Sequence, residues 1–170
     1  MILNDLAVVC ALALAQLLTG YGGHLPTDYD ARFDVCVEVA QAASDFAPDL
    51  PITLVVAVAA NESAFTSPVS KAGARGPLQI MPQYFCPDKN GEVWPHKRRG
   101  RLQGCDLIRY GVHALQWFRD EYQGDWAEAL CHWNSGTKCY KSSRSFARKI
   151  LRLHRLLDAQ MRAVMRHHHD

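Results

Sequence analysis

One acidic residue, Glu62, directly follows a long apolar run at residues 54–60. The alanines in this run, and its passage into Asn61 and Ser63 on either side of Glu62, favour a buried helix over a buried strand. Burial disfavours the charged form of a carboxyl group and raises its pKa. A carboxyl group that stays protonated near neutral pH can donate a proton to a glycosidic oxygen, which makes Glu62 a candidate general acid. Taken alone, Glu62 could equally be an exposed residue at a helix end.

Two further blocks strengthen the case for Glu62. Residues 70–82 read SKAGARGPLQIMP, and residues 129–136 read ALCHWNSG. Gly73 and Gly76 permit sharp backbone turns beside a ligand. Ser and Gln side chains offer the hydrogen bonds that orient sugar hydroxyl and acetamido groups, and Met81 offers an adaptable apolar surface for a sugar face. Core packing is the alternative interpretation for Met81 and Leu78.

In this order, the three blocks resemble the family 1 soluble lytic transglycosylases across residues 31–155. The resemblance implies a lysozyme-like, goose-type fold. It also implies cleavage of the β-1,4 bond between N-acetylmuramic acid and N-acetylglucosamine, with 1,6-anhydromuramyl ends. By this resemblance Glu62 is the catalytic acid and base. The implied substrate-binding residues are Ser63, Ser70, Gln79, Met81, Trp133 and Asn134.

The sequence departs from this family at three points. One is the expected helix at Leu107 to Leu115, which lacks the family's Asn near its start and its Tyr before Leu115. Pro77-Leu78 stands where the family has Leu-Met, and Trp133 stands where it has Tyr. An indole has one N–H donor and no acceptor, so we expect Glu62 to be tuned differently.

No second acid falls in a matching block, and Asp88, Glu92 and Asp106 stay unassigned. By resemblance, the substrate's own 6-hydroxyl is the nucleophile, and neither metal nor cofactor is expected. A hydrolytic muramidase using water with Asp88 or Asp106, and a non-catalytic structural or glycan-binding module, remain alternatives.

Apolar spacing predicts an α+β fold that is predominantly α, with an irregular, Gly- and Pro-rich middle lobe at residues 65–104. Helices are expected from Phe33 to near Ala47, across residues 107–118, and from an N-cap at Asp125 to Trp133. A last helix is expected to begin between residues 142 and 145. We divide the chain into an apolar segment and linker (1–30), a transglycosylase domain (31–155) and a basic tail (156–170).

Six cysteines are many for 170 residues. Bonds Cys86–Cys105 and Cys131–Cys139 would each close a loop and suit an oxidising compartment. Buried thiols are an alternative, and a zinc site is disfavoured because the chain has no Cys-x-x-Cys pair.

The two ends of the chain bear on its partners. Residues 6–18 are apolar but shorter than the about 20 residues that span a bilayer. Asp5 precedes them and no Lys or Arg does, so we expect an uncleaved helix that packs on the domain, a partner or a membrane, with a cleaved export signal as the alternative. Residues 138–166 hold nine Lys and Arg with Asp158 as the only acid. They form either a solvated face or a surface for anionic polymers, lipid phosphates or another protein.

A net charge of +2 does not suggest a nucleic-acid binder. Both ends suit docking into a virion or an envelope machine, so a bacteriophage virion protein acting in the host periplasm is the favoured setting. An exported bacterial enzyme of the periplasm is the alternative.

Overall fold

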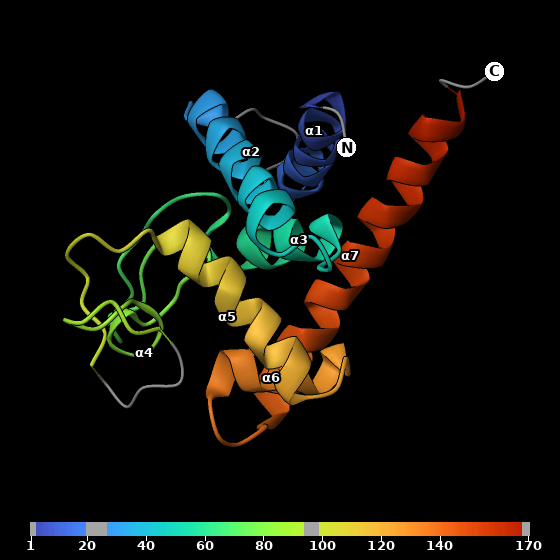
Figure 1. Cartoon of the computed structure of the whole chain (residues 1–170). Helices are drawn as coiled ribbons and strands as arrows, with labels where there is room; N and C mark the ends of the chain where they lie inside the picture. Colours follow the sequence, from blue (N-terminus) through green and yellow to red (C-terminus); the bar gives the residue numbers. More distant parts are fainter. Residues whose placement is uncertain (1–2, 20–26, 94–98, 168–170) are drawn as a thin grey trace.

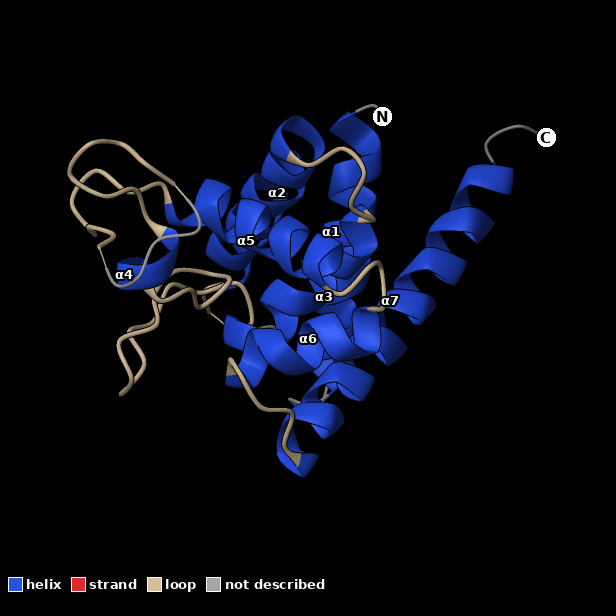
Figure 2. Cartoon of the chain, turned by 60° about the horizontal axis from the view of Figure 1, so that its bottom comes forward, coloured by secondary structure: helices blue, strands red, loops and turns tan. Residues whose placement is uncertain are grey.

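The computed structural model describes residues 3–19, 27–93 and 99–167 (Figure 1). Within these ranges the helices are α1 (Leu3–Thr19), α2 (Tyr29–Phe46), α3 (Ile52–Ser63), α4 (Pro82–Phe85), α5 (Leu107–Glu121), α6 (Trp126–Ser135) and α7 (Lys141–His167). Figure 2 shows helices grouped on one side and most of the loops, with α4, on the other. Parts of three expected features lie outside the described residues: 1–2 and 20–26 of the apolar segment and linker, 94–98 of the middle lobe, and 168–170 of the basic tail.

The prediction of a mainly helical fold is confirmed. In the described ranges the only β pairing is an isolated antiparallel bridge between Arg75 and Ile80. The β component of the expected α+β class is therefore not confirmed. Helices α2, α5 and α6 cover the segments expected from the sequence, and α7 begins at Lys141, slightly earlier than expected. The carboxylate of Asp125 caps α6 by accepting hydrogen bonds from the amides of Ala127 and Glu128.

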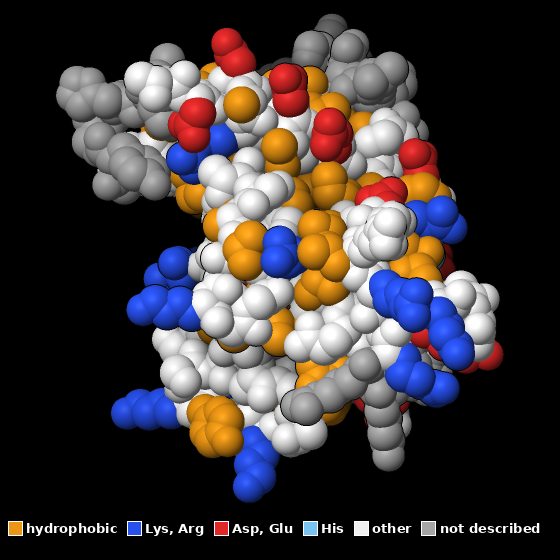
Figure 3. Space-filling view, turned by 90° about the vertical axis from the view of Figure 1, so that its left-hand side faces the viewer, with side chains coloured by type: hydrophobic (Ala, Val, Ile, Leu, Met, Phe, Trp, Pro, Cys, Tyr) orange, Lys and Arg blue, Asp and Glu red, His pale blue; other side chains and the backbone are white. Residues whose placement is uncertain are grey.

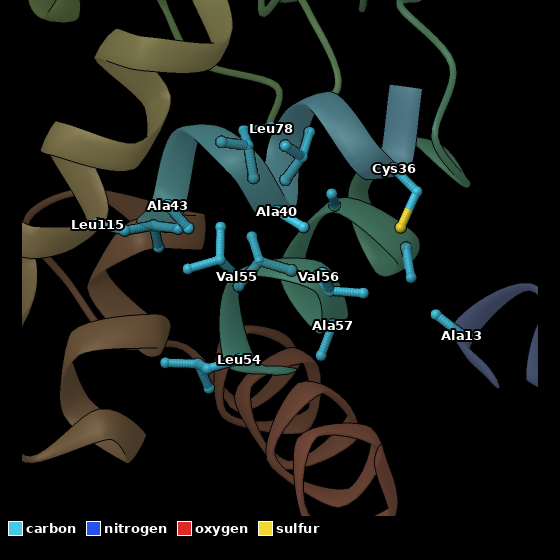
Figure 4. Packing of buried hydrophobic residues seen from close by; sticks show 14 of the residues in the cluster. Ala13, Cys36, Ala40, Ala43, Leu54, Val55, Val56, Ala57, Leu78 and Leu115 are labelled. Carbon is cyan, nitrogen blue, oxygen red and sulfur yellow. The ribbon is translucent and has the colours of Figure 1, made fainter. Parts of the chain in front are cut away.

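Helix α3 forms the centre of the core, and every residue from Thr53 to Ala60 is buried. Each Val costs a helix less than about 0.7 kcal/mol in propensity. Burying its side chain contributes about 1.5–3 kcal/mol, so burial decides the conformation of this run. Figure 4 shows α3 side chains facing residues of other elements: Ala13 of α1, Ala40 and Ala43 of α2, Leu78, and Leu115 of α5. Helix α7 also packs against α3.

Helix α1 packs against α2, α3 and α7. Leu6, Val9, Ala13 and Leu14 are buried, which places one face of the apolar segment in the core. A disulfide between Cys10 and Cys36 joins α1 to α2. None of the described helices is long and apolar enough to cross a membrane.

All six cysteines lie in the described residues, and all are paired. The two pairs considered from the sequence, Cys86–Cys105 and Cys131–Cys139, are bonded. The Cys10–Cys36 bond was not expected, because nothing in the sequence indicates that the apolar segment lies beside α2.

The middle lobe at residues 65–104 is irregular, as expected, and α4 is the helix that its described part contains. The Cys86–Cys105 disulfide closes it covalently. The buried Asp88 closes a turn, since its Oδ1 accepts hydrogen bonds from the amides of Asn90 and Glu92.

Candidate active site

Helix α3 ends immediately after Glu62, in an unusual turn. Ala64 and Phe65 have φ angles of 51° and 61°, in the left-handed region that costs a non-glycine residue about 1–2 kcal/mol. Burial of Phe65, which is 1% exposed, offsets part of this cost. The Arg32 side chain of α2 donates a hydrogen bond to the Ala64 carbonyl at 3.0 Å, and Thr66 donates to the Ser63 carbonyl. The turn therefore fixes the point at which the chain leaves α3 beside Glu62.

Glu62 is half-buried, and its side chain forms a hydrogen bond with Trp133 of α6. The Trp133 indole Nε1–H donates to Glu62 Oε1 at 2.8 Å. Burial raises the pKa of Glu62 to about 7, and the indole hydrogen bond opposes that rise because it favours the carboxylate. Near neutral pH both forms of the carboxyl group are populated, which suits a group that must first give and then take a proton.

Trp133 is held in place by aromatic rings from two other helices. Its ring centroid lies 6.2 Å from Phe85 of α4 and 5.7 Å from Phe118 of α5, the latter in an edge-to-face arrangement. The substituted position noted in the sequence thus carries a donor to Glu62. The tuning differs from that of a Tyr, because an indole can only donate.

Ser63 joins the end of α3 to the loop that carries residues 76–80. Its hydroxyl lies 2.8 Å from the Pro77 carbonyl and 3.3 Å from the Ala59 carbonyl, both of which accept. The structure therefore gives Ser63 a positioning contact within the protein, where the sequence suggested a substrate contact.

Ser70 and Gln79 shape the same loop. Ser70 Oγ accepts a hydrogen bond from the Ala74 amide at 2.9 Å, so its own hydroxyl hydrogen can still be donated. The amide nitrogen of Gln79 donates to the Pro68 and Gly76 carbonyls at 2.9 and 2.8 Å. Both amide hydrogens of Gln79 are therefore used within the protein, and its Oε1 is the atom with which it could accept from a ligand.

Two glycines bring this loop against α5. A Cβ added to Gly111 would lie 2.6 Å from Leu78 Cδ1, and one added to Gly76 would lie 2.9 Å from Leu107 Cβ. Only a residue without a side chain fits at either position without movement. Leu78 is fully buried, so it is a core residue and not part of a saccharide-facing surface.

The remaining expected site residues are placed as follows. Met81 is half-buried and precedes α4, where its carbonyl accepts from the amides of Tyr84 and Phe85. Asn134 is exposed near the end of α6, next to Trp133. Trp133 is thus the one expected site residue that forms a hydrogen bond with the Glu62 side chain.

The acids left unassigned by the sequence have structural surroundings. Asp88 closes its turn in the lobe, and the exposed Asp106 caps α5 by accepting from the Arg109 amide at 3.0 Å. Glu92 is exposed. Among the described residues, none of these carboxylates contributes to the pKa of Glu62, which is set by burial and Trp133.

Sequence reasoning missed three residues that support the site. Arg32 anchors the turn after α3, and Phe85 and Phe118 hold the Trp133 ring. A signal existed for Phe118, which falls on the apolar face of the expected helix at residues 107–118. The contact of Arg32 spans 32 residues, and no local pattern marks it.

A mainly helical domain that holds a protonatable carboxyl group at the end of its central helix is consistent with the lysozyme-like class. The chain belongs to the family described as "Transglycosylase SLT domain", whose model matches residues 38–150. Membership of this family implies lytic transglycosylase activity on peptidoglycan. No curated protein and no solved structure matches the chain.

Proposed function

We propose that this protein cleaves the β-1,4 bond between N-acetylmuramic acid and N-acetylglucosamine and leaves 1,6-anhydromuramyl ends, with Glu62 as catalytic acid and base. The observation that carries the proposal is the state of Glu62. It lies half-buried at the end of α3, its pKa is raised to about 7, and one of its oxygens is held by the Trp133 indole. Family membership supplies the class of substrate.

The reaction moves one proton out of Glu62 and one back. The protonated carboxyl group donates to the glycosidic oxygen as the bond to the muramyl anomeric carbon breaks. The muramyl acetamido group stabilises the positive charge at that carbon. The Glu62 carboxylate then takes the proton of the 6-hydroxyl, whose oxygen bonds to the anomeric carbon and closes the anhydro ring. Trp133 stabilises the carboxylate between the two transfers, since its N–H donates to Oε1.

Intramolecular attack is favoured over hydrolysis because of the surroundings of the other acids. A glycosidase that activates water needs a second carboxylate beside the bond that breaks. Asp88 and Asp106, the acids considered for that role, accept backbone hydrogen bonds that stabilise a turn and a helix end. The substrate's own hydroxyl requires no such second group.

Substrate contacts are proposed from groups that keep hydrogen-bonding capacity. The Ser70 hydroxyl hydrogen, the Gln79 Oε1 atom and the exposed Asn134 amide can bond sugar hydroxyl or acetamido groups. The Met81 side chain supplies an apolar surface. The face that carries the irregular lobe is not uniformly basic, because Figure 3 shows acidic side chains gathered at its upper end and Lys and Arg below them. A nucleic-acid binder typically carries a uniformly basic surface instead.

The setting that we propose is an oxidising compartment, which is where three disulfides form and persist. A bacteriophage virion protein that opens the host wall for genome delivery fits this setting. An exported bacterial enzyme of a secretion or conjugation system fits it as well. The buried face and disulfide of α1 support a mature protein that keeps this helix. Amino-terminal sequencing of native protein tests this point, and a mature end after residue 20 would favour the exported enzyme.

Digestion of purified sacculi, followed by mass spectrometry of the released muropeptides, tests the reaction. We expect anhydro products, each lighter by one water than the corresponding hydrolysis product. Products at the hydrolysed mass would establish a muramidase instead. Release no faster than from sacculi without protein would favour a non-catalytic wall-binding module, provided that urea unfolding shows the sample to be folded.

A further inference from the structure

A second cluster of chemically active side chains lies where α6 meets α7, the orange region of Figure 1. Glu128 and His132 are one turn apart on α6, and Cys139 precedes α7. One donor atom from each of these three side chains lies within 4.8 Å of the other two. Carboxylate oxygen, imidazole nitrogen and cysteine sulfur are the ligand atoms that Zn²⁺ takes in proteins.

The imidazole of His132 is oriented by two contacts outside the cluster. Its Nδ1 lies 2.6 Å from the Gly136 carbonyl oxygen, and a carbonyl only accepts, so Nδ1 carries the hydrogen. In the neutral ring the lone pair is then on Nε2, which lies 3.9 Å from Glu128 Oε2. Tyr122 stacks on the ring at 4.5 Å and 11°, which fixes its plane. A backbone carbonyl that holds the second ring nitrogen is the usual support of a metal-binding histidine.

The carboxylate of Glu128 is oriented in a similar way. Arg144 of α7 donates a hydrogen bond to Oε1 at 2.6 Å. The other oxygen, Oε2, lies toward the cluster, 3.6 Å from the Cys139 sulfur. Each of the two α6 side chains thus has one atom held by the protein and one atom facing the common centre.

Cys139 is bonded to Cys131, and a disulfide sulfur is a poor ligand for zinc compared with a thiolate. Cys131 lies three residues after Glu128 on α6, so the two are neighbours on the helix surface, and its sulfur is bonded to that of Cys139. Reduction would therefore place a second sulfur beside the cluster and complete a set of four ligands.

We propose that the dithiol form of the Cys131–Cys139 pair binds one Zn²⁺ through Glu128, His132 and Cys139, with Cys131 as the fourth ligand. Disulfide and zinc are then alternative cross-links at one place. A dithiol reductant gives two electrons and two protons to the disulfide, becomes a disulfide itself, and leaves two thiols. Zinc binding releases the proton of each coordinating thiol to solvent. Ligand bonds of about 2.0–2.3 Å require the donor atoms to approach one another by about 1 Å from their present spacing.

The proposal gives the α6–α7 junction a cross-link before its disulfide forms. Cys131 and His132 directly precede Trp133, which donates to Glu62. Either cross-link fixes the end of α6 that carries this donor.

The test isolates the thiol while the other two disulfides stay intact. Cys131→Ser frees Cys139 without any reductant, and Cys86→Ser is the matched control because it frees Cys105, outside the cluster. All proteins carry alanines at positions 167–169, where the sequence has three consecutive histidines that would bind metal by themselves. Bound Zn²⁺ is measured by titration against a chromogenic chelator. Co²⁺ substitution reports a thiolate ligand by its charge-transfer absorption.

We expect Cys131→Ser to bind one Zn²⁺ per chain and to show the Co²⁺–thiolate band, because three ligands remain and water takes the fourth position. Adding His132→Gln should weaken Zn²⁺ binding at least tenfold. Neither Cys86→Ser nor the oxidised parent should bind comparably. Equal binding by Cys131→Ser and Cys86→Ser, or no loss with His132→Gln, would overturn the proposal. If Cys131→Ser does not fold, the parent reduced with a phosphine is compared with and without His132→Gln, and equal zinc binding overturns the proposal in the same way.

Discussion

The central helix α3 and the irregular lobe at residues 65–104 position their side chains by different forces. In α3, residues 54–59 are 0% exposed, and apolar burial alone determines where they lie. In the lobe, the turns are closed by a disulfide and by hydrogen bonds between side chains and the backbone, in which Ser70 and Asp88 accept from amides and Gln79 donates to carbonyls. Glu62 lies where these two regions meet. Burial by the core raises its pKa, and the lobe begins three residues after it.

This comparison teaches that one apolar core serves two purposes here. The same burial that stabilises α3 also keeps the carboxyl group of Glu62 partly protonated near neutral pH. The lobe contributes contacts to the backbone that are individually small, since a hydrogen bond is worth about 0.5–1.5 kcal/mol net. Changes in the core should therefore lower the free energy of unfolding most, and changes near Glu62 should alter the pH dependence.

The largest effect on stability is expected from Leu54→Ala. Leu54 is 0% exposed, and truncation of such a side chain costs about 2–5 kcal/mol through lost burial and a residual cavity. The specific activity of the folded fraction should stay unchanged, because Leu54 lies two turns from Glu62 along α3. Urea unfolding and wall-clearing assays measure both quantities. A cost below about 1 kcal/mol would mean that α3 does not dominate the core.

The next effect concerns the stability of the wild type as pH rises. The pKa of Glu62 is about 7 in the folded protein against its ordinary 4.5, so the native state binds the proton more tightly. Stability due to this group is therefore present below pH 4.5 and is lost as pH rises to about 7, by no more than about 3 kcal/mol. In Glu62→Gln this loss is absent. Urea unfolding should show the variant gaining on the wild type between pH 4 and pH 8, and an equal difference at both pH values would contradict the burial of Glu62.

Gly111→Ala tests the close packing of α5 against the loop at residues 76–80. The added Cβ would lie 2.6 Å from Leu78 Cδ1, so we expect a cost of about 1–3 kcal/mol from overpacking. Gln116→Ala, on the same helix, is the control and should change stability by less than about 0.5 kcal/mol. Equal stability of the two variants would show that the loop moves to accommodate the added Cβ and is not packed tightly against α5.

The smallest expected effect, about one pH unit, is that of Trp133→Phe on the pH profile. The indole N–H stabilises the carboxylate form of Glu62, so its removal should raise the pKa of Glu62 further. The alkaline limb of the kcat/KM profile should then move to higher pH. Trp126→Phe, at the start of α6, should leave the limb in place. A limb that stays fixed or moves to lower pH in Trp133→Phe would contradict the tuning proposed for Glu62.

Local patterns predicted much of the fold. The apolar run of α3, the Asp125 cap of α6 and the spacing on α7 each depend on residues close in sequence. Glu62 was identified because a motif accompanies it. The features that escaped prediction join distant residues or break local preferences. The Trp133–Glu62 hydrogen bond spans 71 residues, and Ala64 and Phe65 take a conformation that favours glycine.

The cysteines show the same limit. Loop closure suggested Cys86–Cys105 and Cys131–Cys139, whose members are 19 and 8 residues apart. Cys10–Cys36 depends on how α1 packs against α2, and only the assembled fold supplies that information.

The rate of wall digestion by Glu62→Gln tests the central claim most directly. The amide keeps the size of the side chain and an oxygen for the Trp133 N–H, but it cannot donate and retake a proton. Release of muropeptides from purified sacculi should fall by about 10²–10⁴-fold, while urea unfolding shows a folded protein. Release at the wild-type rate would contradict the role assigned to Glu62.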